Sequence, residues 1–153
     1  MSKNNAFESS KGKHGKKAVL FDLDGTLADT VDPNAHHKEN HEGFRNRIRA
    51  ADAIPDMVEK VRKAHSKGRD VVILTARSAH YRQDTKAWLN EHGIPYNSLI
   101  MRPTDDARKD TVVKKSLLEK DVLPNFAVKK AYDDKEKNVK MYRKEGIKAK
   151  KVN

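Results

Sequence analysis

Residues 17–24 read KAVLFDLD and are followed directly by Gly25. The four residues from Ala18 to Phe21 are all apolar, and a short apolar run that stops at a turn residue is typical of a strand buried on both faces. Such strands occur in parallel sheets that helices cover on both sides. The rest of the chain is therefore expected to supply helices and further buried strands.

Downstream of this strand, helical and extended patterns alternate to the end of the chain. Further strands are predicted at 70–75, 98–101, 128–132 and 147–152. Apolar residues at helical spacing predict helices from Ile54 to a stop at Gly68, from a Ser78 cap to Gly93 and Pro95, over 110–120, and through Val139 and Tyr142 to Gly146. This alternation predicts an α/β fold with three layers, in which a Rossmann-like, mostly parallel sheet lies between helices.

Two segments do not fit the alternation. Residues 1–16 are polar and rich in Lys, Ser and Gly, so they are predicted to be a disordered basic arm beside a single domain formed by 17–153. Within that domain, residues 27–53 are polar, contain three histidines and have room for one short helix. About 27 residues are too few for a separate domain, because compact domains usually exceed ~50 residues. We expect a small cap or insert, which leaves a site open to bulky or polymeric substrates.

The chain is strongly basic, with 33 Lys and Arg against 22 Asp and Glu, a net charge of +11. Both ends are enriched: the first 17 residues carry five Lys against one Glu, and the last 19 carry eight Lys or Arg against two Glu. Basic surfaces attract polyanions such as nucleic acids, because neutralised phosphates release their counterions. A solvated surface that serves solubility is the alternative interpretation.

The composition also argues against several classes of protein. No stretch approaches the roughly 20 apolar residues that span a bilayer, and the N-terminus lacks the apolar core of a secretory signal. Cysteine is absent, which excludes disulfides and suits a cytoplasmic protein. Residues 12–17 contain Gly and Lys without the G-x-x-x-x-G-K-[ST] spacing of a phosphate loop, so no fused ATP-binding kinase module is expected in this chain.

Polar side chains follow the predicted strands where each strand ends. In chain order they are Asp22, Asp24 and Thr26, then Thr75 and Arg77, then Arg102, and finally Asp133 and Asp134. Because carboxyl ends of parallel strands share one edge, where ligands bind, these side chains should converge there, with Lys114 from the following helix. Crowded carboxylates need a cation, and a site with oxygen ligands alone favours Mg²⁺ over zinc.

A metal ion combined with Arg, Lys and Thr donors is suited to holding a phosphoryl group. A carboxylate beside the metal can act as a nucleophile, and a second one nearby as a general acid and base. Each residue also has an ordinary interpretation: Asp22 can accept turn amides, Asp133 and Asp134 can cap a helix, Thr75 can be a β-branched strand residue, and the arginines can be surface charges. The functional interpretation is favoured because separate coincidences would have to fall at successive strand ends.

Three segments resemble the motifs of haloacid dehalogenase-like phosphatases: VLFDLDGTLADT (19–30), ILTAR (73–77) and AYDDK (131–135). The resemblance runs from about Val19 to Val152, and so covers nearly everything except the N-terminal arm. The run IMRPTDDARKDTVVKK (100–115) is similar to the phosphatase domain of bacteriophage polynucleotide kinase–phosphatase. The resemblance implies a magnesium-dependent phosphatase that acts on nucleic-acid ends.

The resemblance also implies roles for individual residues. Asp22 would become phosphorylated, and Asp24 would protonate the leaving oxygen and then activate water. Mg²⁺ would bind Asp22, the main-chain carbonyl of Asp24 and Asp133, with Asp134 assisting. Thr75 and Lys114 would hold phosphoryl oxygens beside Thr26. Arg77 and Arg102 would bind substrate or order the site, and Asp110 would orient the groups around it.

The sequence departs from the family pattern at three places. Thr75 replaces a Ser and keeps the hydroxyl, whereas Lys135 replaces an Arg and so loses a bidentate donor. Residues 27–53, where a cap would select the substrate, match weakly. In that segment His37 and His41 have the spacing of helical zinc ligands but no third ligand, so a polar helix face is preferred. Tyr81 and Trp88 are expected in the core rather than as a platform for stacking bases.

Three functions remain in competition. The first is a polynucleotide 3′-phosphatase of nucleic-acid repair, which cleans 3′-phosphate ends of DNA or RNA. The second is a phosphatase for mononucleotides or other small phosphoesters, which needs the same machinery. The third is a catalytically idle nucleic-acid-binding module, although such a module has no need of a nucleophile beside a metal.

Overall fold

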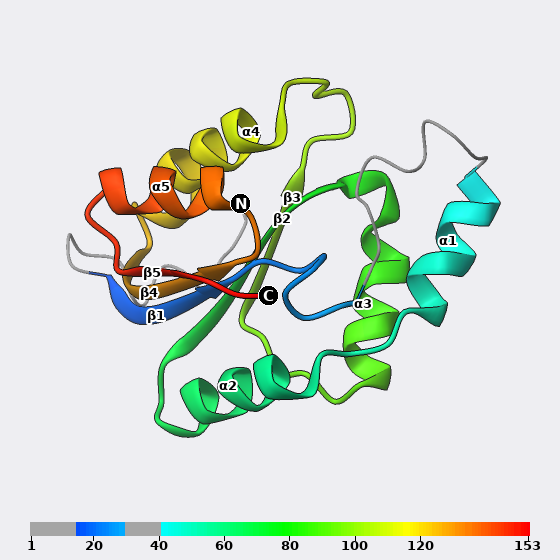
Figure 1. Ribbon diagram of the computed structural model, residues 1–153, viewed down its shortest axis with the longest axis horizontal. Coiled ribbons are helices and arrows are strands. Elements are labelled where there is room, and N and C mark those ends of the chain that lie inside the picture. Colours follow the sequence, from blue (N-terminus) through cyan, green and yellow to red (C-terminus); the bar gives the residue numbers. More distant parts are fainter. Residues whose placement is uncertain (1–14, 30–40) are drawn as a thin grey trace.

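The computed structural model describes residues 15–29 and 41–153. Its centre is a five-stranded sheet in the order β3-β2-β1-β4-β5, and every pair of neighbouring strands is parallel. Helices lie on both sides of this sheet (Figure 1). The three-layer α/β fold that the alternating patterns predict is therefore confirmed.

The elements follow one another as the sequence predicts. The strands are β1 (Lys16–Phe21), β2 (Asp70–Ser78), β3 (Ser98–Arg102), β4 (Phe126–Asp133) and β5 (Ala149–Lys151). The α-helices are α1 (His41–Ala50), α2 (Pro55–Ser66), α3 (Arg82–Glu91), α4 (Asp110–Leu117) and α5 (Glu136–Lys144). The 3₁₀ turn η3 (Ala79–Tyr81) precedes α3, and the π-helical turn η4 (Leu118–Val122) continues α4.

Several bounds differ from the prediction for local reasons. β1 ends at Phe21 rather than at Asp24, because the carbonyl of Leu23 accepts the main-chain N–H groups of the next turn. Ser78 belongs to β2, and its hydroxyl caps η3 rather than α3 by accepting the N–H of His80 at 3.1 Å. β5 is shorter than predicted, since only three of its residues pair with β4.

Both faces of the sheet are buried, and successive residues of a strand alternate between them. In β2, Val71 and Ile73 face the layer formed by α1, α2 and α3, whereas Val72 and Leu74 face α4 and α5. Two hydrophobic clusters result, one on each side of the sheet. This is the reason why the strands read as continuous apolar runs.

Helix α1 contributes to the first of these clusters. Phe44 and Ile48 are buried beside Tyr81 and Trp88, and the Trp88 Nε1–H donates to the carbonyl of Ala51 at 2.8 Å. The expectation that Tyr81 and Trp88 belong to the core is confirmed. Residues 1–14 and 30–40 lie outside the described part of the chain, and with them most of the predicted basic arm, His36 and His37. Lys16, the last residue of the predicted arm, instead begins β1, because it pairs with Phe126 of β4. No helix in the described part is long and apolar enough to cross a membrane.

The order of strands determines where a ligand can bind. From β1 the chain passes to β2 and β3 on one side, then returns to β4 and β5 on the other. In open parallel sheets, such a reversal leaves a crevice at the carboxyl ends of the central strands. The carboxyl end of β1 lies at this point, between β2 and β4.

Candidate active site

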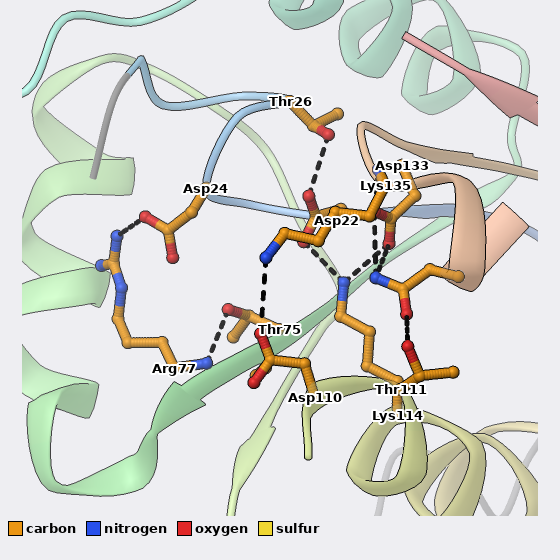
Figure 2. A network of polar contacts seen from close by, with 12 residues as sticks. Asp22, Asp24, Thr26, Thr75, Arg77, Asp110, Thr111, Lys114, Asp133 and Lys135 are labelled. Atoms are coloured by element: carbon orange, nitrogen blue, oxygen red, sulfur yellow. Dashed lines mark hydrogen bonds and ion pairs between the residues drawn. The ribbon is translucent and has the colours of Figure 1, made fainter. Parts of the chain in front are cut away.

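The predicted polar residues of β1, β2 and β4 meet at this crevice beside α4 (Figure 2). Asp22 directly follows β1, Thr75 belongs to β2, Asp133 ends β4, and Lys114 lies on α4. All four side chains are buried. The hollow between them is also lined by Asp24, Ala76, Asp110, Asp134, Lys135 and Asn138.

Asp22 lies between two donors, one on each carboxylate oxygen. Lys114 Nζ is 2.6 Å from Asp22 Oδ1, and the Thr26 hydroxyl donates to Oδ2 at 3.0 Å. The main-chain N–H of Asp22 bonds to the carbonyl of Tyr132 on β4, which ties the residue to both central strands. The carboxylate is thus held by two side chains, Thr26 from the turn after β1 and Lys114 from the distant helix α4, rather than by turn amides.

Asp133 is buried without measurable exposure and has more partners than any other carboxylate in this crevice. Lys114 Nζ lies 2.7 Å from its Oδ2, and the side-chain amide of Asn138 donates to both oxygens at 3.1 and 3.2 Å. The main-chain N–H of Lys135 donates to Oδ1 at 3.0 Å. Asn138 is itself oriented by the Thr111 hydroxyl at 2.8 Å. Helix α5 has Lys135 at its N-cap without a side-chain cap bond, so Asp133 and Asp134 are not capping residues.

Asp24 pairs with Arg77 on the other side of the hollow. Arg77 Nη2 lies 2.5 Å from Asp24 Oδ1, while Nη1 donates to the Thr85 hydroxyl at 2.8 Å. The main-chain N–H of Arg77 donates to the Thr75 hydroxyl oxygen at 3.0 Å. Arg77 is buried, so its charge serves Asp24 rather than the solvent-facing opening.

Arg102 organises the loop between β3 and α4. Its Nε donates to the carbonyl of Ala76, its Nη1 to the carbonyls of Asp106 and Arg108, and its Nη2 to Asp110 Oδ1 at 2.7 Å. Lys135 Nζ approaches the other oxygen of Asp110 at 3.6 Å. Arg102 and Asp110 therefore fix the loop that leads into α4 and Lys114.

Three carboxylates could share a metal ion. Asp22, Asp133 and Asp134 each offer an oxygen, and these atoms lie within 4.8 Å of one another. Asp134 Oδ1 is buried and has no hydrogen-bond partner among the described residues. Three carboxylates with an unpartnered oxygen fit a hard divalent cation, which takes oxygen ligands. The side chain of Asp24 is not part of this group.

Gly25 allows Asp134 to approach this group. Its φ is +84°, a backbone conformation that favours glycine, and a Cβ atom at this position would lie 2.1 Å from Asp134 Oδ2. Any side chain would therefore displace the Asp134 carboxylate. The glycine of the motif is required by both backbone conformation and space.

The pKa values of the buried groups follow from this crowding. Burial raises the pKa of Asp22; Lys114 lowers it and Asp133 and Asp134 raise it, which leaves it well above its ordinary value. Burial alone would lower the pKa of Lys114, but Asp22 and other neighbours raise it well above the usual range, so the ammonium stays charged. Burial also raises the pKa of Asp24, although Arg77 opposes the shift. Asp24 therefore retains a proton to higher pH than an exposed aspartate does.

Two partners in this network, Asn138 and Thr111, were not predicted from the sequence. Asn138 belongs to the buried face of α5 together with Val139 and Tyr142. A polar residue on such a face, five positions after Asp133, was the available signal, because a buried amide needs partners. Thr111 gave no comparable signal.

The arrangement is that of a haloacid dehalogenase-type phosphoric monoester hydrolase, and comparison with known proteins places the chain within this class. Residues 16–153 match the family described as the polynucleotide kinase PNKP phosphatase domain. The match covers every strand and helix of the described structure. The chain belongs to this family.

Individual relatives agree with this assignment. A protein of Autographa californica nuclear polyhedrosis virus, proposed to be a bifunctional polynucleotide kinase/RNA ligase, is 30% identical over 128 residues, which are 82% of this chain and 18% of the relative. A chain in the solved Pnkp1/Rnl/Hen1 complex is 29% identical, with a TM-score of 0.78 over 94% of this chain and 48% of its own length. This chain therefore spans less than half of either relative. The class C acid phosphatase from Bacillus anthracis with tungstate bound has the same fold, with a TM-score of 0.60 at 20% identity over 87% of this chain and 56% of its own length.

Proposed function

We propose that this protein is a magnesium-dependent polynucleotide 3′-phosphatase that works through an aspartyl phosphate on Asp22. The observation that carries the proposal is the position of Asp22, which contacts Lys114 at 2.6 Å and shares a potential metal site with Asp133 and Asp134. A nucleophile in such a site has cationic neighbours that offset the charge of an incoming phosphate. Residues 17–153 would form one phosphatase domain, with 27–53 as its small insert.

In the first half of the reaction, a carboxylate oxygen of Asp22 attacks phosphorus. An oxygen–phosphorus bond forms on Asp22 while the bond from phosphorus to the 3′-oxygen breaks. Asp24 gives its proton to that oxygen, so a hydroxyl leaves the site. The raised pKa of Asp24 suits this step because it keeps the acid protonated closer to neutral pH.

In the second half, Asp24 is a carboxylate and accepts a proton from water. The water oxygen bonds to phosphorus, and the bond between phosphorus and Asp22 breaks. Inorganic phosphate leaves, Asp22 is restored as a carboxylate, and Asp24 is protonated for the next cycle. Two in-line displacements thus replace one difficult hydrolysis.

The other residues bind and orient. Lys114 and Thr75 are proposed to hold phosphoryl oxygens, and Thr26 to orient Asp22. Asp22, Asp133, Asp134 and the main-chain carbonyl of Asp24 would hold Mg²⁺, which when bound neutralises charge on the phosphoryl group. We propose that Arg77 positions Asp24, which its Nη2 contacts, and that Arg102 and Asp110 position the loop before α4, because the Arg102 guanidinium is already bonded to that loop and to Asp110.

The preference for polynucleotide ends rests on the family and on the two relatives whose descriptions name a polynucleotide kinase or Pnkp1. A phosphatase for mononucleotides or small esters remains the second candidate, because the same crevice serves it. A catalytically idle binding module is disfavoured, since buried Asp22, Lys114 and Asp133 side chains are costly to maintain without a catalytic role.

A phosphate-release panel tests the proposal. Oligonucleotides with a 3′-phosphate, the same strands with a 5′-phosphate, and nucleoside monophosphates are compared with Mg²⁺ and with EDTA. We expect the highest kcat/KM for 3′-phosphorylated strands, loss of activity in EDTA, and recovery when Mg²⁺ is restored. Equal or better turnover of mononucleotides would contradict the polynucleotide assignment, and undiminished turnover in EDTA would contradict the metal requirement.

A further inference from the structure

A second hollow, separate from the crevice, lies beside β4. It is a groove of about 420 Å³ between α2 and the strand β4, and the ring of Tyr132 forms part of its floor. Seven of the ten residues that line it are basic, and none is acidic. Six of these basic residues are lysines that form two walls. One wall has Lys60, Lys63 and Lys67 from α2 and its C-terminal end, and the other has Lys129 and Lys130 on β4 and Lys148 before β5.

We call the hollow that these six lysines and Arg69 line the basic groove. Carboxylates of the described residues do not neutralise its cations. Within residues 15–29 and 41–153, no carboxylate forms an ion pair with any of them. Two of them, Lys60 and Lys130, lie over the Tyr132 ring at 5.8 and 5.6 Å from its centre. All six lysines are exposed. Like charges held close together raise the local potential and favour a bound anion.

A β-bulge places two adjacent lysines on this groove. Val128 pairs with Ala18 and Lys130 pairs with Val19, so Lys129 is an extra residue in β4. Side chains normally alternate between the faces of a strand, but an extra residue disturbs this alternation and turns a side chain aside. Lys129 and Lys130 both line the groove for this reason.

The groove exists because the layer of α1, α2 and α3 stops at β1. Helix α2 packs mainly against β1 and β2, whereas α5, which packs against β4 and β5, belongs to the opposite layer. Figure 1 shows α2 below the sheet and α5 above β4 and β5. Lysines, rather than a packed helix, occupy the uncovered face of β4.

We propose that the basic groove binds the sugar–phosphate backbone of the substrate strand, behind the end that enters the crevice. This inference rests on the proposed function and deepens it. Charges distributed along two walls suit an extended polyanion, because a single phosphate ion needs donors that converge on one point. An acidic protein segment is the competing polyanion, and a nucleic-acid strand is favoured because the family is the phosphatase domain of a polynucleotide kinase.

The groove lies within reach of the crevice. Tyr132 lines the groove and the next residue, Asp133, lines the crevice, so both hollows adjoin the carboxyl end of β4. Lys130 precedes Asp133 by three residues, or roughly 10 Å of strand at ~3.3 Å per residue. A stacked strand rises ~3.4 Å per nucleotide, so about three nucleotides cover this distance. The contacts should therefore begin a few nucleotides from the 3′ end.

Binding of a strand that cannot be hydrolysed tests the groove independently of catalysis. A fluorescent single strand of a dozen nucleotides with a 3′-hydroxyl end is titrated with the full chain, and anisotropy gives Kd over a range of salt. The groove variant is Lys63→Gln/Lys67→Gln/Lys129→Gln. Its matched control is Lys86→Gln/Lys120→Gln/Lys140→Gln, which removes the same charge from exposed lysines outside the groove.

We expect the groove variant to raise Kd at least tenfold and to lower the slope of log Kd against log salt by about 2, which is three contacts at ~0.7 each. The control variant should stay within about threefold of wild type. Replacing the same three groove lysines by Arg should retain tight binding, which a folding defect would not allow. An equal loss in both variants, or an unchanged salt slope, would overturn the proposal.

The same proteins separate this inference from the proposed function. On 3′-phosphorylated strands, kcat/KM of the groove variant should fall at least tenfold further than on p-nitrophenyl phosphate. If wild type releases no phosphate from 3′-phosphorylated strands, the proposed function fails, while the 3′-hydroxyl titration still decides whether the groove binds nucleic acid. If an acidic peptide binds wild type but the oligonucleotide does not, the groove proposal is wrong.

Discussion

Strand β4 carries two charged sites of opposite character. At its carboxyl end, Asp133 is buried and contacts Lys114, Asn138 and the main-chain N–H of Lys135. A few residues earlier, Lys129 and Lys130 are exposed and form no ion pair with described residues. A buried charge is tolerated only with well-placed partners, whereas exposed cations without partners remain available to an external polyanion. The crevice is therefore built for chemistry at one atom, and the basic groove for attraction along a chain.

The largest expected effect is the loss of kcat when the Asp22 carboxylate of the crevice is replaced. Asp22→Asn keeps the shape of the side chain but removes the nucleophile, so kcat should fall on the order of 10⁴-fold or more on both polymeric and small substrates. Circular dichroism should show an intact fold. Substantial phosphate release by this variant would mean that another group attacks phosphorus.

Lys114 provides a comparison of stability between the sites. Lys114→Met leaves Asp22 and Asp133 without their shared cation, and breaking a buried ion pair typically costs about 3 to 5 kcal/mol. The matched variant Lys130→Met removes an exposed lysine and should change the free energy of unfolding by no more than about 0.5 kcal/mol. Urea unfolding in EDTA measures both. Similar values for the two variants would mean that the Lys114 contacts contribute little.

A substitution at Asn138 tests whether the partners of Asp133 affect the proposed binding of Mg²⁺ by Asp133. Asn138→Ala removes the amide from both carboxylate oxygens, and loss of a residue that orients a metal ligand typically costs about 10- to 100-fold in metal affinity or activity. The concentration of Mg²⁺ that gives half-maximal activity should rise accordingly. Thr111→Ser, which keeps the hydroxyl that orients Asn138, is the control and should remain near wild type.

The smallest expected effect is a pH dependence of stability. The folded pKa values of Asp22 and Asp24 are raised, so the folded protein binds these protons more tightly than the unfolded chain. Their contribution to stability is fully present below the ordinary value of 3.8 and is lost as pH rises through the raised values. In EDTA, these groups should lower Tm as the pH rises from about 4 through the raised pKa values.

Magnesium should offset part of this loss, because the ion competes with the proton for the Asp22 carboxylate. The increase in Tm on adding Mg²⁺ should therefore be larger at pH 7.5 than at pH 5. An increase that is the same at both pH values would indicate that the ion binds elsewhere.

The sequence predicted the fold and the location of the crevice for a physical reason. Strand ends of a parallel sheet share one edge, so polar residues that follow apolar runs come together whatever the exact bounds of the strands. Asp22, Thr75 and Asp133 were found in this way, and their roles stay predictions.

Other features could not be predicted because they depend on three-dimensional contacts. Arg102 gave no sign in the sequence that its donors are occupied by the carbonyls of its own loop. The basic groove was also missed, since lysines of α2 and β4 become neighbours only through strand order and the bulge at Lys129. The sequence instead directed attention to the basic ends of the chain, and among their described residues only Lys148 lines the groove.

The account depends most on the transfer of phosphorus to Asp22, and rapid acid quenching tests that step directly. Asp24→Asn should still accept phosphorus from an activated ester but should hydrolyse the adduct slowly, because it lacks the base that activates water. We predict acid-stable phosphate on the peptide that contains Asp22 in this variant, and none in Asp22→Asn. Two results would contradict the account. One is phosphate release by wild type without acid-stable phosphate on the Asp22 peptide of Asp24→Asn, and the other is acid-stable phosphate on the same peptide of Asp22→Asn.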